Sequence, residues 1–289
     1  MAKEISSLSQ NPPNLIRKPT SVIRPSNRFM RIPLRELWRF RELLYFLVWR
    51  DLKVRYKQSL LGVGWIILQP VLTMLMFTII FNRILGIETG GKAPYPVMVF
   101  TALLPWQYFA NSLGRSSTSL VGNAQLISKI YFPRMLIPIA NVLTGLVDFG
   151  IGFVVLLAMM AFYGLKPDSS FMALPLALLL ALLAALGVGF WLSALNVQYR
   201  DVQHLAPFLV QIWMYATPII YSISQIPENW QWLYNLNPMV CVVQIFQQVL
   251  LNEAGFSGQN WISVVIVLLI LVSGVLYFQK VERVFADIV

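Results

Sequence analysis

The stretch FMALPLALLLALLAALGVGFWLSALN, residues 171–196, contains no charged side chain and decides the fold class. A helix that crosses a bilayer needs about 20 consecutive apolar residues, because the hydrocarbon core is about 30 Å thick. The whole chain has the same character: of its 289 residues 57% are hydrophobic and 12% charged, and its mean hydropathy is +0.67. Soluble domains carry about 25% charged residues. The sequence therefore predicts an all-α integral membrane protein and excludes a water-soluble enzyme.

Further apolar segments on either side bring the expected number of transmembrane helices to six. In chain order they are residues 62–86, 96–119, 135–163, 171–196, 205–223 and 260–280. The second segment is diluted by polar side chains such as Gln107 and Arg115. The fifth is short and contains Pro207 and Pro218, so we expect it to be kinked or packed inside the bundle. Together the segments form an expected transmembrane domain over residues 62–280.

Residues 34–57 precede the first span and contain no Gly or Pro, which favours one continuous helix. Its apolar residues recur mostly at three- and four-residue steps and include Trp38 and Tyr45, while basic residues recur on another face. The longest apolar run, residues 43–49, is too short to cross a bilayer. We therefore expect an amphipathic helix in the membrane interface. The polar, proline-punctuated residues 1–33 before it are expected to form an irregular cytoplasmic tail.

The basic residues are distributed unequally between the two sides of this topology. The chain has 22 Lys and Arg against 12 Asp and Glu, a net charge of +10. Nineteen of the 22 fall on the side of the N-terminus, and the other side carries Arg83, Lys92 and Lys166. Because cytoplasmic segments carry the excess of Lys and Arg, we expect both termini to be cytoplasmic, including residues 281–289. The charge indicates contact with anionic membrane lipids and excludes nucleic acid as a partner, since the sequence has no solvated basic domain.

The sequence lacks the motifs of several catalytic classes. It contains no Walker A pattern, so this chain has no P-loop for nucleotide phosphates, and H-E-x-x-H and G-x-S-x-G patterns are absent too. Cys241 is the only cysteine and His204 the only histidine. We interpret His204 as an interfacial residue, with a catalytic role beside Asp201 as the alternative. The expectation is no enzymatic activity, no catalytic residue, and no metal or cofactor bound by this chain.

Asp148 is the one ionisable residue in the middle of a predicted span, in the segment LTGLVDFGIGF. At 1.5 Å per residue it lies about 20 Å along a span that begins near residue 135. An intramembrane carboxylate indicates a functional site. The alternative is a protonated or hydrogen-bonded side chain at a glycine-rich helix contact. We expect no basic residue at the same depth, which argues against a proton-coupled carrier.

The segment 120–134 is a predicted cytoplasmic loop that contains a short helix. Leu126, Ile127, Ile130 and Tyr131 form a small apolar face on it. Four clustered large apolar side chains favour docking of a partner protein over a plain surface turn.

The segment 222–259 lies on the external side in this topology and predicts two short helices. Asn237 is the expected N-cap of the second helix and Pro238 its first helical position. Aromatic side chains accompany the two helices, namely Trp230, Trp232, Tyr234 and Phe246. We expect both helices to be re-entrant or interfacial, forming an outer gate over a pathway or, alternatively, an anchor for the bundle.

Aromatic side chains are also frequent within the predicted spans. Most should lie at the interface or face lipid. Ring faces also suit the C–H faces of sugars, so some are candidates for a transport pathway. The candidate pathway residues are Trp65, Trp106, Tyr108, Asp148, Phe208 and Tyr215.

Several motifs, in order along the chain, resemble a known family. They are RDLKVRYKQSLLGVGW at 50–65, LQP at 68–70, LPW at 104–106, NAQLISKIYFPR at 123–134, YRD at 199–201, TPIIY at 217–221 and the pair Asn237 and Pro238. The ordered set resembles the membrane subunits of polysaccharide-exporting ABC transporters, which export O-antigen, teichoic acid or capsule. The resemblance covers residues 34–289.

The resemblance implies a half-transporter in the inner membrane, with two copies of this chain and two cytoplasmic ABC ATPase subunits that bind ATP and Mg²⁺. It implies that the loop over residues 123–134 contacts the ATPase, with the expected contacts Leu126, Ile127, Lys129, Tyr131, Phe132 and Arg134. It also places an entry site for a polyprenyl-pyrophosphate-linked glycan at the interface helix. Arg and Lys bind phosphate oxygens, and the expected residues are Arg50, Lys53, Arg55 and Lys57.

The resulting hypothesis is ATP-driven export of a lipid-linked, O-antigen-like polysaccharide from the cytoplasmic to the external face of the membrane. One alternative is an ABC exporter of a small lipid or drug, which shares the architecture. The other is a membrane-embedded glycan-processing enzyme or assembly scaffold. The enzyme would need a carboxylate or histidine constellation near a membrane face.

Overall fold

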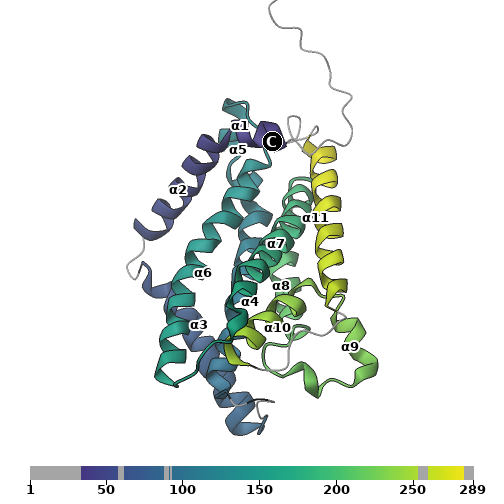
Figure 1. Cartoon of the computed structure of the whole chain (residues 1–289). Coiled ribbons are helices and arrows are strands. Elements are labelled where there is room, and N and C mark those ends of the chain that lie inside the picture. The colour runs from purple at the N-terminus through teal and green to yellow at the C-terminus, as the bar shows by residue number, and fades with distance from the viewer. Residues whose placement is uncertain (1–33, 58–61, 88–90, 92, 253–259, 283–289) are drawn as a thin grey trace, which may run out of the picture. The chain divides into compact units, whose positions relative to one another are not determined.

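The computed structural model describes residues 34–57, 62–87, 91, 93–252 and 260–282, and all regular secondary structure in them is helical (Figure 1). The helices are α1 Leu34–Arg39, α2 Arg41–Lys57, α3 Gly64–Phe77, α4 Tyr95–Gly122, α5 Ala124–Lys129, α6 Leu136–Phe162, α7 Ala173–Gln198, α8 Val202–Tyr215, α9 Glu228–Tyr234, α10 Pro238–Leu251 and α11 Trp261–Glu282. A π-helical segment, Thr78–Ile84, extends α3, and short 3-10 helices cover Ser169–Met172 and Ile223–Gln225. The prediction of an all-α protein is confirmed for this part of the chain.

Four helical stretches in the described residues are long and apolar enough to cross a membrane. They are Gly64–Ile84, Leu136–Phe162, Ser170–Gln198 and Trp261–Glu282. A helix satisfies its own backbone hydrogen bonds, which is what a segment surrounded by lipid requires. With the shorter apolar helix α10, these stretches describe a multi-pass membrane protein.

Helix α4 lies in the interior of the bundle and packs against α3, α6, α7, α8 and α10. Its polar side chains explain why hydropathy alone does not mark it as a span. Thr101, Ser112 and Ser116 are buried between helices, and Gln107 and Arg115 line a cavity. These side chains are turned towards the protein, so they dilute the apolar pattern without meeting lipid.

Helices α7 and α11 cross closely at a pair of glycines. A Cβ atom on Gly187 would lie 2.8 Å from the backbone nitrogen of Leu271, and one on Gly274 would overlap the carbonyl oxygen of Gly187. Small residues allow helix backbones in membranes to approach this closely. The crossing therefore requires glycine at both positions.

The predicted continuous helix over residues 34–57 is divided at Phe40 into α1 and α2, which corrects the expectation. Hydrogen bonds from Phe40 N to Glu36 O (3.1 Å) and from Leu44 N to Phe40 O (3.0 Å) bridge the division. Helix α2 then runs alongside α6 (Figure 1). It packs on the bundle instead of lying apart from it.

The apolar surface of α2 has two faces, where the sequence predicted one. Leu47 is 1% exposed and packs in a core cluster with Phe132 and Leu136. Tyr45 is 71% exposed, because at 100° per residue it lies roughly opposite Leu47 on the helix. The second face thus presents aromatic rings outwards, as suits a helix at headgroup depth.

Helix α8 ends at Tyr215, which corrects the prediction of a segment continuing to residue 223. Pro218 lacks the N–H that a helix would use there, and the residue before a proline is pushed out of the helical conformation. Phe208 and Tyr215 on α8 are more than half exposed in the single chain. The helix therefore covers one side of α4 and is not enclosed by the bundle.

Contacts at the two ends of the bundle separate the connecting segments into two groups. Helices α1 and α5 lie at one end of the bundle (Figure 1). At this end, Arg134 N donates to Glu282 Oε1 (3.1 Å) and Arg134 Nη1 to Glu282 O (3.0 Å). At the other end, Asn252 Nδ2 donates to Lys166 O over 3.2 Å. Within the described residues, the segments predicted as cytoplasmic and those predicted as external thus lie at opposite ends.

Candidate functional site

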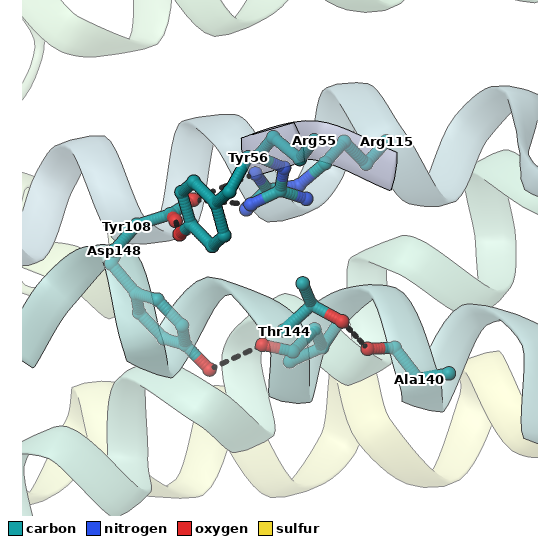
Figure 2. A network of polar contacts seen from close by, with 8 residues as sticks. Arg55, Tyr56, Tyr108, Arg115, Ala140, Thr144 and Asp148 are labelled. Atoms are coloured by element: carbon teal, nitrogen blue, oxygen red, sulfur yellow. Dashed lines mark hydrogen bonds and ion pairs between the residues drawn. The ribbon is translucent and has the colours of Figure 1, made fainter. Parts of the chain in front are cut away.

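Asp148 on α6 accepts hydrogen bonds from three side chains of two other helices (Figure 2). Arg55 Nη1 and Arg115 Nη1 donate to Oδ2 over 2.7 and 2.9 Å, and the Tyr56 hydroxyl donates to Oδ1 over 2.5 Å. The Asp148 side chain is 16% exposed. These charge-assisted bonds join α2, α4 and α6 at one carboxylate.

Tyr56 is the uncharged donor of this cluster. Burial of the ring, together with the hydrogen bond to Asp148, raises the pKa of the Tyr56 hydroxyl to about 12. The hydroxyl therefore keeps its proton at neutral pH and remains a donor to the carboxylate.

The expectation that no basic residue lies at the depth of Asp148 is wrong. Arg115 on α4 reaches it because α4 and α6 are neighbouring antiparallel helices, and Arg55 reaches it because α2 runs alongside α6. The partners lie 93 and 33 residues away in sequence, so local spacing carries no sign of them. Sequence reasoning missed Tyr56 for the same reason. Arg115, noted there only as a polar interruption of a span, was the available signal.

Arg115 has unused hydrogen-bonding capacity. Its Nε and Nη2 atoms are buried and have no hydrogen-bond partner among the described residues, and the same holds for Ser112 Oγ. A Cβ atom at Gly145 would lie 2.9 Å from Nη2 and 3.0 Å from Ser112 Oγ. The glycine provides the space that this edge of the guanidinium occupies.

The cluster borders a cavity of about 230 Å³ between α2, α3, α4 and α6. Its lining combines two arginines and one carboxylate with side-chain amides and aromatic rings. The lining residues are Arg55, Trp65, Ile66, Gln69, Pro70, Leu104, Gln107, Tyr108, Asn111, Arg115, Gly145, Asp148, Phe149 and Gly152. Such a lining can bind an anionic group and the hydroxyl and C–H faces of a sugar.

The six candidate pathway residues occupy three different places. Trp65, Tyr108 and Asp148 line this cavity. Trp106 is buried and packs edge-on against Trp213. The two candidates on α8, Phe208 and Tyr215, lie on its exposed side. The structure thus brings half of the set together.

The expected coupling residues differ in exposure. Leu126 and Ile127 pack on the core at the end of the bundle, and Lys129 ends α5. Tyr131 is 96% exposed, whereas Phe132 is 4% exposed and belongs to the core. Arg134 hydrogen-bonds to Glu282. Only some of the expected coupling side chains are thus available on the surface.

The four basic residues expected at the substrate entry also have different environments. Arg50 donates to Asp51 Oδ1 (2.9 Å) and to Asn123 Oδ1 (2.9 Å), which ties α2 to the start of α5. Arg55 holds Asp148, and Lys53 and Lys57 are exposed. Arg55 is the member of this set that lines the cavity.

Asn237 joins α10 to α8 and to the turn that follows α8. It caps α10 through Met239 N (3.0 Å), with Pro238 at the first helical position, so the predicted cap is confirmed. Its Oδ1 also accepts from Trp213 Nε1 (2.9 Å), and its Nδ2 donates to Thr217 Oγ1 (2.9 Å). One amide thus fixes α8, the following turn and α10.

The aromatic side chains expected at the external gate differ in exposure and in contacts. Trp230 and Trp232 on α9 are exposed. Tyr234 accepts a hydrogen bond from the Tyr221 hydroxyl over 3.2 Å. Phe246 on α10 is buried and packs edge-on against Phe149, whose ring borders the cavity.

His204 lies at the start of α8, with its Nε2 atom 3.2 Å from Gln203 Nε2. Within the ranges that the structure describes, no three His, Cys, Asp or Glu side chains group closely enough to hold a metal ion.

Comparison with known proteins gives one consistent relationship. Residues 42–251 match the model of the ABC-2 type transporter family. The chain is 30% identical over 250 residues to the O-antigen export system permease protein RfbA of Klebsiella pneumoniae, covering 86% of this chain and 95% of that protein. It is 33% identical over 218 residues to RfbA of Myxococcus xanthus, covering 75% and 83%. Identity to the polysialic acid transport protein KpsM of Escherichia coli is 24% over 208 residues, covering 70% and 78%.

The family match spans more than half of the chain, and it includes α2, the helices around the cavity and α10. This chain belongs to the ABC-2 type transporter family, as a membrane subunit.

Proposed function

We propose that this chain is the membrane subunit of an ATP-driven exporter that moves a lipid-linked, O-antigen-like polysaccharide across the inner membrane. The observation that carries the proposal is the relationship to an O-antigen export permease over 95% of that protein's length. A second relative is named as a polysialic acid transporter. The cavity with arginines, amides and aromatic rings supports a glycan-bearing, anionic substrate.

In this proposal six segments cross the membrane. The four apolar stretches are joined by α4, whose 28 residues exceed the about 20 needed. The sixth is α8 with the turn that follows it. Both termini lie in the cytoplasm, as the excess of basic residues on that side indicates. Helices α9 and α10 then form an outer gate held by Asn237.

ABC-2 membrane subunits work with separate ABC ATPase subunits. For this chain we infer a pair of copies with two ATPase subunits, which bind ATP and Mg²⁺. The exposed Tyr131 and the neighbouring Lys129 support docking of the ATPase at α5 and the residues that follow it. Membrane lipid surrounds the apolar stretches and the aromatic face of α2.

Export of a small lipid or drug is the second candidate. A groove lined only by apolar residues of α4, α7 and α8, with a volume of about 380 Å³, suits an acyl chain and favours this alternative. Ala206, Leu209 and Trp213 are among its lining residues.

Deletion of the gene in the source organism tests the proposal. Loss of the chain should leave lipid-linked glycan on the cytoplasmic face, detected as polymer that becomes accessible to a glycan-specific antibody only after spheroplasts are lysed. A matched strain lacking the ATPase subunit should show the same accumulation. Normal surface polysaccharide in the deletion strain would contradict the proposal.

A further inference from the structure

We propose that the cavity beside Asp148 binds the phosphoryl group of a lipid-linked sugar, with Arg115 as the residue that holds it. Asp148 is then the built-in counter-ion of Arg115, on the edge of the guanidinium that the ligand does not use. The identity of the ligand as a lipid-linked sugar rests on the proposed function. The phosphoryl chemistry rests on the side chains of the cavity alone.

The charges around the cavity do not balance. Arg55 and Arg115 bring two positive charges and Asp148 one negative charge. All three side chains are less than a third exposed, so solvent screens the excess positive charge only weakly. An anion that enters the cavity neutralises this excess.

Arg115 has one edge of its guanidinium without a hydrogen-bond partner among the described residues. Asp148 uses only Nη1, while Nε and Nη2 remain buried without a partner among the described residues. These two nitrogens form one edge of the planar group, and their parallel N–H bonds match two oxygens of a phosphoryl group. Leaving a charged donor buried and unpaired costs free energy, which a bound anion would recover.

The remaining lining fits the sugar that follows a phosphoryl group. The side chains of Gln69, Gln107 and Asn111 supply amides that donate to and accept from hydroxyls. Trp65 and Tyr108 supply ring faces for the C–H groups of a sugar ring. Anion donors and sugar contacts therefore occur in one cavity.

The size of the cavity limits what it holds. Its volume of about 230 Å³ is below the roughly 300–1,000 Å³ of sites that enclose a drug-sized ligand. It can take a phosphoryl group with an adjoining sugar and excludes a polymer chain. We therefore assign it to recognition of the lipid-proximal end of the substrate, separate from the passage of the polymer.

Binding to the full chain, purified together with its ATPase subunits in detergent, tests the assignment. The probe is a radiolabelled polyprenyl-pyrophosphate-linked sugar. Arg115→Gln should weaken binding at least about tenfold, since a hydrogen bond to a charged group contributes that much or more. Asp148→Asn should strengthen binding several-fold, because it removes a negative charge that repels the anionic ligand. Arg83→Gln, which removes an exposed positive charge that does not line the cavity, is the matched control and should bind as the wild type does.

Opposite changes in probe affinity for Arg115→Gln and Asp148→Asn distinguish a ligand-binding site from a purely structural ion pair. If Arg115→Gln binds normally, or if Asp148→Asn weakens binding, the proposal is overturned. If Arg115→Gln fails to assemble with the ATPase, Arg115→Lys decides, because it keeps the charge and loses the two-nitrogen edge. The affinity of Arg115→Lys for the probe should fall below that of the wild type, and unchanged affinity would overturn the assignment.

Competition identifies the source of the phosphoryl group. Phosphatidylglycerol and inorganic pyrophosphate should displace the probe only at much higher concentration than unlabelled lipid-linked sugar. Equal competition by phosphatidylglycerol would assign the cavity to a membrane lipid and overturn the lipid-linked sugar. Export by the wild-type complex is measured separately. Export without Arg115-dependent binding refutes this inference alone, whereas binding without export refutes the proposed function.

Discussion

The Arg115 guanidinium donates to the Asp148 carboxylate over 2.9 Å and so joins α4 to α6 inside the bundle. The same carboxylate holds Arg55 at 2.7 Å, so α2 is attached to this pair of helices as well. A partly buried charge that loses its partner is expensive to keep. The cluster is therefore a point at which single substitutions have measurable effects on both stability and ligand binding.

Asp148→Ala is expected to lower the free energy of unfolding by about 3 kcal/mol. This is the lower end of the range for breaking a buried ion pair, because the three charged side chains remain partly exposed. Arg115→Ala should cost less than Asp148→Ala, since Arg55 continues to neutralise the carboxylate. Thermal unfolding of both single variants and the double variant measures the coupling. Strictly additive effects would show that the two side chains do not interact.

Tyr56→Phe is expected to destabilise the attachment of α2 by about 1.5 to 3 kcal/mol, the contribution of a hydrogen bond to a charged group. The pKa of Tyr56 is raised from its usual 10.0 to about 12, so its contribution is complete below pH 10 and is lost as the pH rises from 10 to 12. The difference in stability between wild type and variant should shrink across that interval. Tyr45→Phe on the exposed side of α2 is the control and should show no such difference. A constant difference up to pH 12 would argue against the hydrogen bond as its cause.

Tyr131 and Phe132 are neighbours in sequence, but Tyr131 is exposed and Phe132 is buried. Substitutions at the two positions therefore distinguish an effect on contact with the ATPase from an effect on the stability of the fold. Tyr131→Ala should change the free energy of unfolding by no more than about 0.5 kcal/mol, because the side chain is 96% exposed. It should reduce substrate-stimulated ATP hydrolysis in the complex if this surface docks the ATPase. Phe132→Ala should cost about 3–5 kcal/mol, because its ring is 4% exposed.

Thermal unfolding and ATPase assays on the same preparations check both expectations. Normal ATP hydrolysis and normal assembly in Tyr131→Ala would remove the assignment of this surface to the ATPase.

Asn237→Ala should loosen the junction of α8 and α10. It removes the N-cap of α10, which contributes about 1 kcal/mol, together with the hydrogen bonds to Trp213 and Thr217. We expect faster proteolysis in the segment between these helices. Asn237→Ser restores the cap acceptor without the amide donor and should be cleaved at an intermediate rate. Equal cleavage of Asn237→Ala and wild type would show that the segment is held by other contacts.

The sequence predicted best those features that depend on neighbouring residues. The uncharged run at 171–196 lies within a single helical stretch, and Asn237 caps the helix that Pro238 begins. Both follow from local rules, apolar length in one case and capping in the other. The end of α8 at Tyr215 also has a local cause, Pro218. The sequence predicted a kinked segment there and not the end of the helix.

The features that the sequence could not provide depend on which helices are neighbours. Asp148 has no partner within its own span, and its arginines come from α2 and α4. Phe132 follows a short surface helix, and only its packing with Leu47 shows that it belongs to the core. Spacing grouped Tyr45 with the other apolar residues on a single face, although α2 has two apolar faces and tertiary packing decides which of them meets α6.

Export by the purified complex in proteoliposomes is the most direct test of the central claim. The chain is reconstituted with its ATPase subunits, polyprenyl-pyrophosphate-linked O-antigen is added to the ATPase side, and polymer on the opposite side is measured with a glycan-specific antibody. The account predicts transfer that requires ATP and Mg²⁺ and that falls at least about tenfold in Arg115→Gln at subsaturating substrate. Transfer of a labelled phospholipid without transfer of the glycan would contradict it.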